Sequence, residues 1–275
     1  MKSFIVEKQI KLNKFLLDSY NGELSYAVFQ KLLRNKDIKV NGKRVNKDLL
    51  LNAGDKIEVY YDGAKKQLEL KVLLNECGVL AVDKPCGITS IDFESQVKSV
   101  YSSAVLVHRL DRNTSGILLF ALDSVAEQEL LKTFKNRTIS KFYTAEVYGK
   151  VQKDSEVLTA YLVKDSDKSL VKIYDTEVKD SEKIITGYEV IERRENSTIL
   201  RVELFTGKTH QIRAHLAHIG HFIIGDGKYG KNAINETFKV KTQRLTASKV
   251  VFEFDKSSPL YNLNGKVIEI DRKAF

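Results

Sequence analysis

Apolar residues near the start of the chain recur at helical spacing. Leu12 and Leu16 share one face of a predicted helix, which Asn21-Gly22 is expected to end. Ser25 can cap a second helix, whose inward face includes Phe29. Two short amphipathic helices are therefore predicted before the first strand.

The apolar positions then alternate, as in strands with one buried face. Ile38 and Val40 lie on one predicted strand, and Asn41-Gly42 is typical of the tight turn that leads into a returning strand. A last strand is predicted at Lys56–Tyr61. Residues 1–62 are thus expected to form a small α/β domain with the order helix, helix, hairpin, strand.

After residue 70, short apolar runs outnumber the helical patterns. The runs predicted as strands are Val79–Val82, Val105–Val107, Ile117–Leu122, Phe142–Tyr148, Ile199–Phe205 and Val250–Phe254. Helical spacing appears at Ser124–Phe134 and Thr209–Ile219. Many strands joined by short turns favour an α+β fold, with a mixed, mainly antiparallel sheet and peripheral helices, over a doubly wound α/β fold. Residues 150–198 carry charge but no motif, and we interpret them as peripheral strands and loops.

A polar stretch separates these two patterns. Asp62-Gly63 and the lysines that follow are typical of a connector, so we expect a domain at residues 1–62, a linker at 63–69 and a larger domain at 70–275. A chain of 275 residues with 43% hydrophobic content can bury both cores, which excludes a wholly disordered protein.

The charge balance points to a polyanionic partner. The formal net charge is +9, and cations gather along the second helix and the hairpin. A solvated face explains such a cluster equally simply, but its skew favours contacts to an RNA backbone. The candidate contacts are Lys31, Arg34, Lys39, Lys43 and Arg44.

The cysteines and the hydropathy of the chain indicate its cellular compartment. Cys77 and Cys86 are isolated thiols, which form no disulfide framework and fit a reducing compartment. No signal peptide opens the sequence, and no apolar run approaches the roughly 20 residues that span a bilayer. We expect a cytoplasmic monomer without a membrane partner.

The segment from His108 to Gly116 holds the clearest candidate chemistry. It places the carboxylate of Asp111 between Arg109 and Arg112, in a polar turn between two apolar runs. Nearby guanidinium groups favour a charged carboxylate, and loops between strands often display reactive groups. An ordinary turn closed by Gly116 is the alternative.

This segment, His108-Arg109-Leu110-Asp111 followed by Thr114-Ser115-Gly116, resembles the active-site motif of the RluA-type pseudouridine synthases. Three further segments resemble that family in the same order, and the resemblance covers nearly everything after residue 70. They are Asp83–Ile88, Lys141–Ala145 and Thr206–His215, the last followed by Gly225-Asp226 and Tyr229-Gly230.

The resemblance implies an enzyme that isomerises uridine to pseudouridine in RNA without a cofactor. It implies that Asp111 either attacks C1′ or abstracts the 2′ proton, that Arg213 pairs with Asp111, and that Arg109 fills the space of a flipped nucleotide. Tyr143 would stack on uracil and help to remove the C5 proton. Further candidate substrate contacts are His108, Thr114, Lys208 and His210.

The first domain resembles the S4 RNA-binding fold. An S4-like module resembles the RluC and RluD branch of the family, which implies large-subunit ribosomal RNA as the substrate, with tRNA as the alternative. A non-catalytic S4-type adaptor is one rival interpretation. A glycosidase is another, but it requires a second carboxylate, for which Asp226 is the remote candidate.

Two tempting motifs fail on spacing. His210, His215, His218 and His221 match no zinc pattern, so no metal is expected. Gly207-Lys208-Thr209 is no phosphate-binding loop, because Val202 stands where its first glycine is required, and no nucleotide cofactor is expected.

Overall fold

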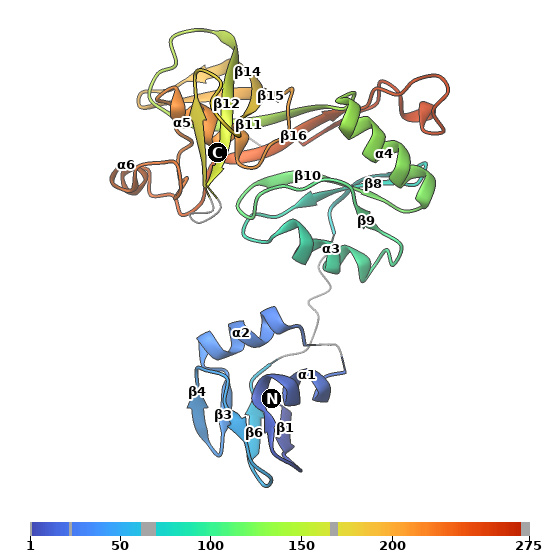
Figure 1. Ribbon diagram of the computed structural model, residues 1–275, viewed down its shortest axis with the longest axis vertical. Helices are drawn as coiled ribbons and strands as arrows, with labels where there is room; N and C mark the ends of the chain where they lie inside the picture. Colours follow the sequence, from blue (N-terminus) through green and yellow to red (C-terminus); the bar gives the residue numbers. More distant parts are fainter. Residues whose placement is uncertain (1, 22–23, 62–69, 166–169, 271–275) are drawn as a thin grey trace. The chain divides into compact units, whose positions relative to one another are not determined.

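The computed structural model describes residues 2–21, 24–61, 70–165 and 170–270 (Figure 1). The chain divides into two compact units, Met1–Glu69 and Leu70–Phe275, each with its own hydrophobic core. The predicted linker at residues 63–69 lies outside the described residues, as does Gly22 of the predicted helix end.

The first unit contains the helices α1 (Leu12–Ser19) and α2 (Tyr26–Asn35). Its strands are β1 (Lys2–Ile5), β2 (Ile10–Lys11), β3 (Ile38–Val40), β4 (Lys43–Val45), β5 (Leu50–Leu51) and β6 (Lys56–Val59). Four of them form an antiparallel sheet in the order β1-β6-β3-β4, and β2 pairs with β5.

Local chemistry accounts for two features of this unit. The hydroxyl of Ser25 accepts a hydrogen bond from the Val28 amide and so caps α2, as predicted. Asn41 and Gly42 have φ angles of +48° and +76°, which confirms the tight turn between β3 and β4. The turn and the cap fix how α2 meets the hairpin.

The second unit is built around one long sheet. Its strands are β7 (Val72–Glu76), β8 (Val79–Lys84), β9 (Val105–Leu106), β10 (Ser115–Ala121), β11 (Ser140–Tyr148), β12 (Ser155–Asp165), β13 (Leu170–Tyr174), β14 (Glu182–Arg193), β15 (Ser197–Leu204), β16 (Leu245–Val251) and β17 (Val267–Glu269). The order is β13-β12-β14-β15-β11-β16-β10-β8-β7, with β17 on β16 and β9 on β10. Figure 1 labels β8, β10, β11, β12, β14, β15 and β16 of this sheet.

The helices of the second unit are fewer than its strands. They are α3 (Ser90–Lys98), α4 (Ser124–Asn136), α5 (Gln211–His218), α6 (Asn232–Thr237) and the short 3₁₀ turn η1 (Tyr261–Leu263). Within the described residues, none is long and apolar enough to span a membrane. Few helices on a mainly antiparallel sheet confirm the predicted class for this unit.

Both faces of the sheet centre are covered. β8 and β10 are buried along their whole lengths, which explains their continuous apolar runs. Leu80 and Val82 face a core shared with Phe93 of α3 and Ile212 of α5. The alternate residues face a second core, which includes Leu130 of α4. The helix α5 is thereby pressed against the sheet beside the turn that carries Asp111.

A close approach joins β10 to β16, which run parallel. Gly116 has a φ of +111°, and a Cβ built there would lie 2.2 Å from the carbonyl oxygen of Ala247. Only glycine fits this approach. Gly116 thus sets the position of the turn before β10.

Several sequence-based predictions need correction. Residues 150–198 were expected to be peripheral, but β14 is an internal strand between β12 and β15. The strand predicted at Val250–Phe254 ends at Val251, and the helix predicted at Thr209–Ile219 begins at Gln211. The helix α3 was not predicted at all; Thr89 caps it through the Asp92 amide.

Candidate active site

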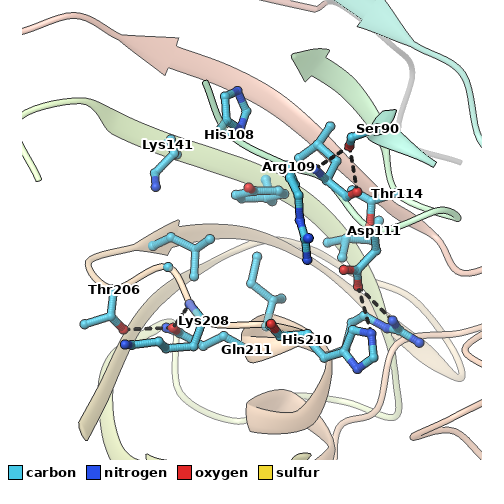
Figure 2. A pocket seen from close by; sticks show the side chains of 18 of the residues that line it. Ser90, His108, Arg109, Asp111, Thr114, Lys141, Thr206, Lys208, His210 and Gln211 are labelled. Carbon is cyan, nitrogen blue, oxygen red and sulfur yellow. Dashed lines mark hydrogen bonds and ion pairs between the residues drawn. The ribbon is translucent and has the colours of Figure 1, made fainter. Parts of the chain in front are cut away.

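A cleft of about 760 Å³ opens on the second unit beside Asp111 (Figure 2). Its walls come from the turn between β9 and β10, the connection from α4 to β11, and the loop from β15 into α5. Polar and apolar side chains from these distant segments line one cavity, an arrangement typical of a ligand site.

Asp111 and Arg213 meet directly in this cleft. The Oδ2 atom of Asp111 accepts a hydrogen bond of 2.7 Å from Nη1 of Arg213. The other edge of the same guanidinium is held by Asp226, through Nε at 2.7 Å and Nη2 at 2.9 Å. Arg213 therefore bridges a partly exposed carboxylate in the cleft and a fully buried one behind it.

This bridge controls charge as well as geometry. Burial alone lowers the pKa of the Arg213 guanidinium, but its hydrogen bonds to Asp226 and Asp111 outweigh burial and raise that pKa. Burial acts to raise the pKa of Asp226, yet the Arg213 hydrogen bonds and the amides of Lys228 and Tyr229 bring it below its usual value. Both groups are charged at neutral pH.

His210 approaches the same oxygen of Asp111 as Arg213 does. Its Nε2 is 3.9 Å from Oδ2 of Asp111, and its Nδ1 is 2.9 Å from the hydroxyl of Tyr229. Burial lowers the pKa of His210, while the charge of Asp111 opposes that shift. His210 also has a φ of +55° at the start of α5, a left-handed conformation that is uncommon for histidine.

The turn that carries Asp111 is fixed from two sides. The hydroxyl of Ser90 both accepts from the amide of Leu110 and donates to its carbonyl oxygen, each at 2.9 Å. The hydroxyl of Thr114 accepts a hydrogen bond of 2.8 Å from the side-chain amide of Gln243. Together these contacts hold both ends of the turn.

Lys84 ties the Asp83–Ile88 segment to the same turn. It has no exposed surface, and its Nζ donates to the carbonyl oxygens of Pro85, Ile88 and Arg112. Burial lowers the pKa of this ammonium to about 8. Three carbonyl acceptors satisfy a group that would otherwise be costly to bury.

Tyr143 lies on β11 and lines the cleft. Its side chain belongs to the core that includes Ala145 and Val147 on the same face of the strand. Burial, reinforced by the charge of Asp111, raises the pKa of the Tyr143 phenol. The phenol keeps its proton at neutral pH.

The other residues predicted to contact the substrate differ in whether their side chains already have a partner within the described residues. Nε2 of His108 accepts the Leu119 amide, and burial lowers the pKa of His108 to about 3, so its imidazole is neutral. Lys208 forms an ion pair with Glu182. Arg109 lines the cleft, is exposed, and has no ion-pair partner within the described residues.

The predicted RNA contacts of the first unit do not belong to this cleft. Lys39 donates to the hydroxyl of Tyr60, and Arg44 donates to the carbonyl oxygen of Lys36. Lys31, Arg34 and Lys43 are exposed, without an ion pair to the described residues. They form a separate basic surface on α2 and the β3–β4 hairpin.

Sequence reasoning missed the contact between Asp226 and Arg213. Asp226 was considered only as a remote second carboxylate for hydrolysis, but both of its oxygens are occupied and it has no exposed surface. The clustered histidines also have separate partners: Thr186 for His215, Asp175 for His218 and the Tyr148 carbonyl for His221. No group of three metal-ligating side chains occurs among the residues the structure describes.

Comparison with known proteins identifies relatives of this chain. Residues 78–218 match the family model described as RNA pseudouridylate synthase. The ribosomal large subunit pseudouridine synthase C of Rickettsia bellii is 31% identical over 276 residues, covering 88% of this chain and 91% of that protein. The enzyme of the same name from Vibrio parahaemolyticus is 29% identical over 246 residues, covering 80% of this chain and 76% of that protein.

Solved structures support the fold. The human RNA pseudouridylate synthase domain containing 1 superposes with a TM-score of 0.63 at 22% identity, covering 74% of this chain and 83% of that one. At this identity the likeness concerns the fold alone.

Proposed function

The chain belongs to the RNA pseudouridylate synthase family and is an RNA pseudouridine synthase, an isomerase, and on this premise we propose that it modifies uridine in large-subunit ribosomal RNA. Two relatives that match most of its length are named ribosomal large subunit pseudouridine synthase C. Because those bacterial enzymes act on ribosomal RNA by name, the cytoplasm is the compartment we propose for this chain.

We assign the central chemistry to Asp111. The reaction breaks the bond from C1′ to N1 and forms a bond from C1′ to C5; the proton leaves C5 and N1 gains one, so no external donor or acceptor is consumed. A single carboxylate suffices, either by attacking C1′ or by taking the 2′ proton. The observation that carries this assignment is the 2.7 Å contact between Asp111 and Arg213 in an open cleft.

Arg213 is the residue that positions Asp111. Because Asp226 binds Nε and Nη2, the orientation of the planar guanidinium is fixed, and Nη1 points towards Asp111. A fixed donor keeps Oδ2 of Asp111 occupied and leaves Oδ1 for the ribose. Preorganisation of this kind avoids a reorientation cost during the reaction.

We assign to Tyr143 the stacking on uracil and the removal of the C5 proton. Its ring lines the cleft and offers a stacking surface for uracil. Since the pKa of the phenol is raised, the hydroxyl takes the C5 proton only if its own proton moves to a neighbour. Asp111, whose charge contributes to that shift, is a suitable acceptor once the new glycosidic bond has formed.

Arg109 and the first unit are assigned to RNA binding. An exposed guanidinium beside the cleft can stack in the space that a flipped nucleotide leaves. We propose that the first unit is an S4-like RNA-binding domain, supported by its order of two helices, hairpin and strand and by its exposed cations. This domain favours the RluC-like branch and ribosomal over transfer RNA.

One experiment tests the substrate and one tests the residue. Pseudouridine maps of ribosomal and transfer RNA from cells with and without the gene should differ in large-subunit ribosomal RNA; a difference confined to tRNA would replace the proposed substrate. Asp111→Asn should abolish tritium release from C5-labelled RNA while RNA binding survives. Normal turnover by that variant would remove Asp111 from the chemistry.

A further inference from the structure

Lys141 lines the same cleft as Asp111 but takes no part in the contacts described above. It lies two positions before Tyr143 on β11, so both side chains leave the same face of the strand. Figure 2 shows Lys141 beside His108 at one end of the cleft, with Asp111 and His210 at the other. The cleft thus has a second, basic end.

The Lys141 ammonium has an aromatic neighbour where a carboxylate would be expected. Its Nζ lies 5.2 Å from the centre of the Phe134 ring. Across the cleft, a Cβ built on Gly207 would be 3.6 Å from Nζ, so the loop before α5 lies close to this half-buried ammonium. No carboxylate forms an ion pair with Lys141 within the described residues.

Arg137 lines the same cleft from the C-cap position that follows α4. Its guanidinium is exposed and likewise has no ion-pair partner in the described part of the chain. Its φ is +62°, a left-handed helix end that glycine occupies without strain. Burial first, and the charge of Arg137 second, lower the pKa of Lys141. Two cations thus approach one space without an anion between them.

Lys208 and Arg213 differ in this respect, whereas Arg109 also lines the cleft without an ion pair to the described residues. Lys208 is neutralised by Glu182, and Arg213 by Asp111 and Asp226. A desolvated ammonium without a counter-ion is stabilised when an anion enters its site. RNA supplies one such anion with every nucleotide.

We propose that Lys141 and Arg137 bind a phosphodiester of the RNA strand next to the target uridine, and so set how far the strand enters the cleft. The proposal rests on the proposed function in one respect, since it takes the Asp111 end as the place of the target uridine. Lys141 acts here as a substrate-binding residue, and Phe134 holds its ammonium in position.

The test uses the full-length protein and a short oligouridylate, whose dissociation constant is measured over a range of KCl concentrations. Lys141→Met keeps the unbranched stem on Phe134 and removes the charge. We expect Kd to rise about tenfold and the slope of log Kd against log salt to fall by about 0.7. Lys141→Arg should restore the slope.

Lys249→Met is the matched control. Lys249 lies on β16, with its Nζ 6.0 Å from the Phe142 ring and 3.6 Å from Glu269. It is also a lysine over a phenylalanine, but it has a carboxylate partner and does not line the cleft. Its loss should leave the salt slope unchanged.

Arg137→Gly separates binding from folding. Glycine relieves the left-handed backbone, so the melting temperature should stay equal or rise, while the salt slope falls as for Lys141→Met. A lower melting temperature with an unchanged slope would mean that Arg137 serves only the helix end, and would overturn its assignment.

Oligouridylates with one neutral methylphosphonate linkage locate the contact. The Lys141→Met penalty should vanish when one particular linkage is neutral and persist at the others. A wild-type slope in Lys141→Met, or a penalty indifferent to the neutral linkage, overturns the proposal. These readouts need no turnover, so a map that names tRNA, or an active Asp111→Asn, would refute the proposed function while leaving this result standing.

Discussion

Nη1 of Arg213 donates a 2.7 Å hydrogen bond to Oδ2 of Asp111, although the two residues are 102 positions apart. Their contact joins the turn before β10 to the helix α5, and Asp226 fixes the guanidinium from behind. The position of the cleft carboxylate therefore depends on Asp226, which has no exposed surface and does not line the cleft.

Asp226→Asn should test that dependence. The substitution removes one of the two carboxylates that balance the charge of the buried Arg213 guanidinium. The free energy of unfolding should therefore fall by about 3 kcal/mol. The freed guanidinium can turn, and kcat should fall about a hundredfold. Urea denaturation and C5-tritium release measure the two effects.

Asp154→Asn is the control for this prediction. Asp154 forms an ion pair with Arg193, but its carboxylate is 89% exposed, so the pair contributes little to stability. This substitution should change neither quantity appreciably. Wild-type stability and turnover in Asp226→Asn would show that Arg213 holds Asp111 without help.

His108 should make stability depend on pH. Its pKa in the folded protein is about 3, against 6.5 for an unperturbed histidine, because burial penalises the imidazolium. A lowered folded pKa gives stability that is complete above pH 6.5 and is lost as pH falls towards 3. One such group contributes at most about 1.4 kcal/mol per pH unit.

His108→Gln should flatten this dependence, because the side-chain amide oxygen can accept the Leu119 amide without titrating. The measurement is urea denaturation of both proteins between pH 7.5 and pH 4.5. Parallel curves for His108→Gln and wild type would contradict the prediction.

How far the sequence predicted this molecule depended on how local each signal was. The cap at Ser25 and the turn at Asn41-Gly42 depend on neighbouring residues only, and both are confirmed. β14 was missed because Thr186 and Gly187 are buried within it, which breaks the apolar alternation. Thr186 is buried because Gln211 and His215 of α5 contact it, and no local pattern reveals such a contact.

The residues of the candidate site also differ in how far the sequence predicted them. The motifs pointed to Asp111, Tyr143 and Arg213, which the structure places in one cleft, though their roles stay predictions. The bidentate ion pair between Arg213 and Asp226 was not predicted, because it depends on how α5 packs against the loop that follows it.

Gly116→Ala should disrupt the parallel pair of β10 and β16. A Cβ at this position meets the Ala247 carbonyl oxygen at 2.2 Å, and backbone atoms cannot give way cheaply. We expect a loss of about 3 kcal/mol or more in the free energy of unfolding. Gly220→Ala, with a φ of +87° and open space around it, should cost only about 1 kcal/mol. Equal losses would mean that conformation, and not the close approach, decides the Gly116 result.

The exposed cations of the first unit should carry salt-dependent affinity. Replacing Lys31, Arg34 and Lys43 by alanine removes three charges that have no ion pair within the described residues. The salt slope of binding to large-subunit ribosomal RNA should fall by about 2, with the circular dichroism spectrum unchanged.

A matched triple variant replaces cations that are already paired with carboxylates. Lys98, Lys132 and Lys153 contact Glu94, Glu129 and Glu156. Their removal should leave the slope near that of the wild type. A slope equally reduced in both variants would assign the effect to net charge and not to the first unit.

The hydroxyl of Tyr143 should matter for turnover and not for folding. The described residues give it no hydrogen-bond partner, although the ring is buried in the cleft wall. Tyr143→Phe therefore removes a group that awaits the substrate, and stability should stay equal or rise slightly. Because proton transfer by a positioned group contributes about 10²–10⁴ in rate, C5-tritium release should slow by that factor with RNA affinity unchanged.

Tyr188→Phe distinguishes this effect from the general loss of a buried hydroxyl. Tyr188 is a buried tyrosine of β14 whose hydroxyl donates to Glu156 at 3.1 Å, outside the cleft. Its loss should lower stability by about 1 kcal/mol and leave turnover intact. If Tyr143→Phe released tritium at the wild-type rate, the ring alone would serve the reaction and the C5 proton would have to leave by way of another group.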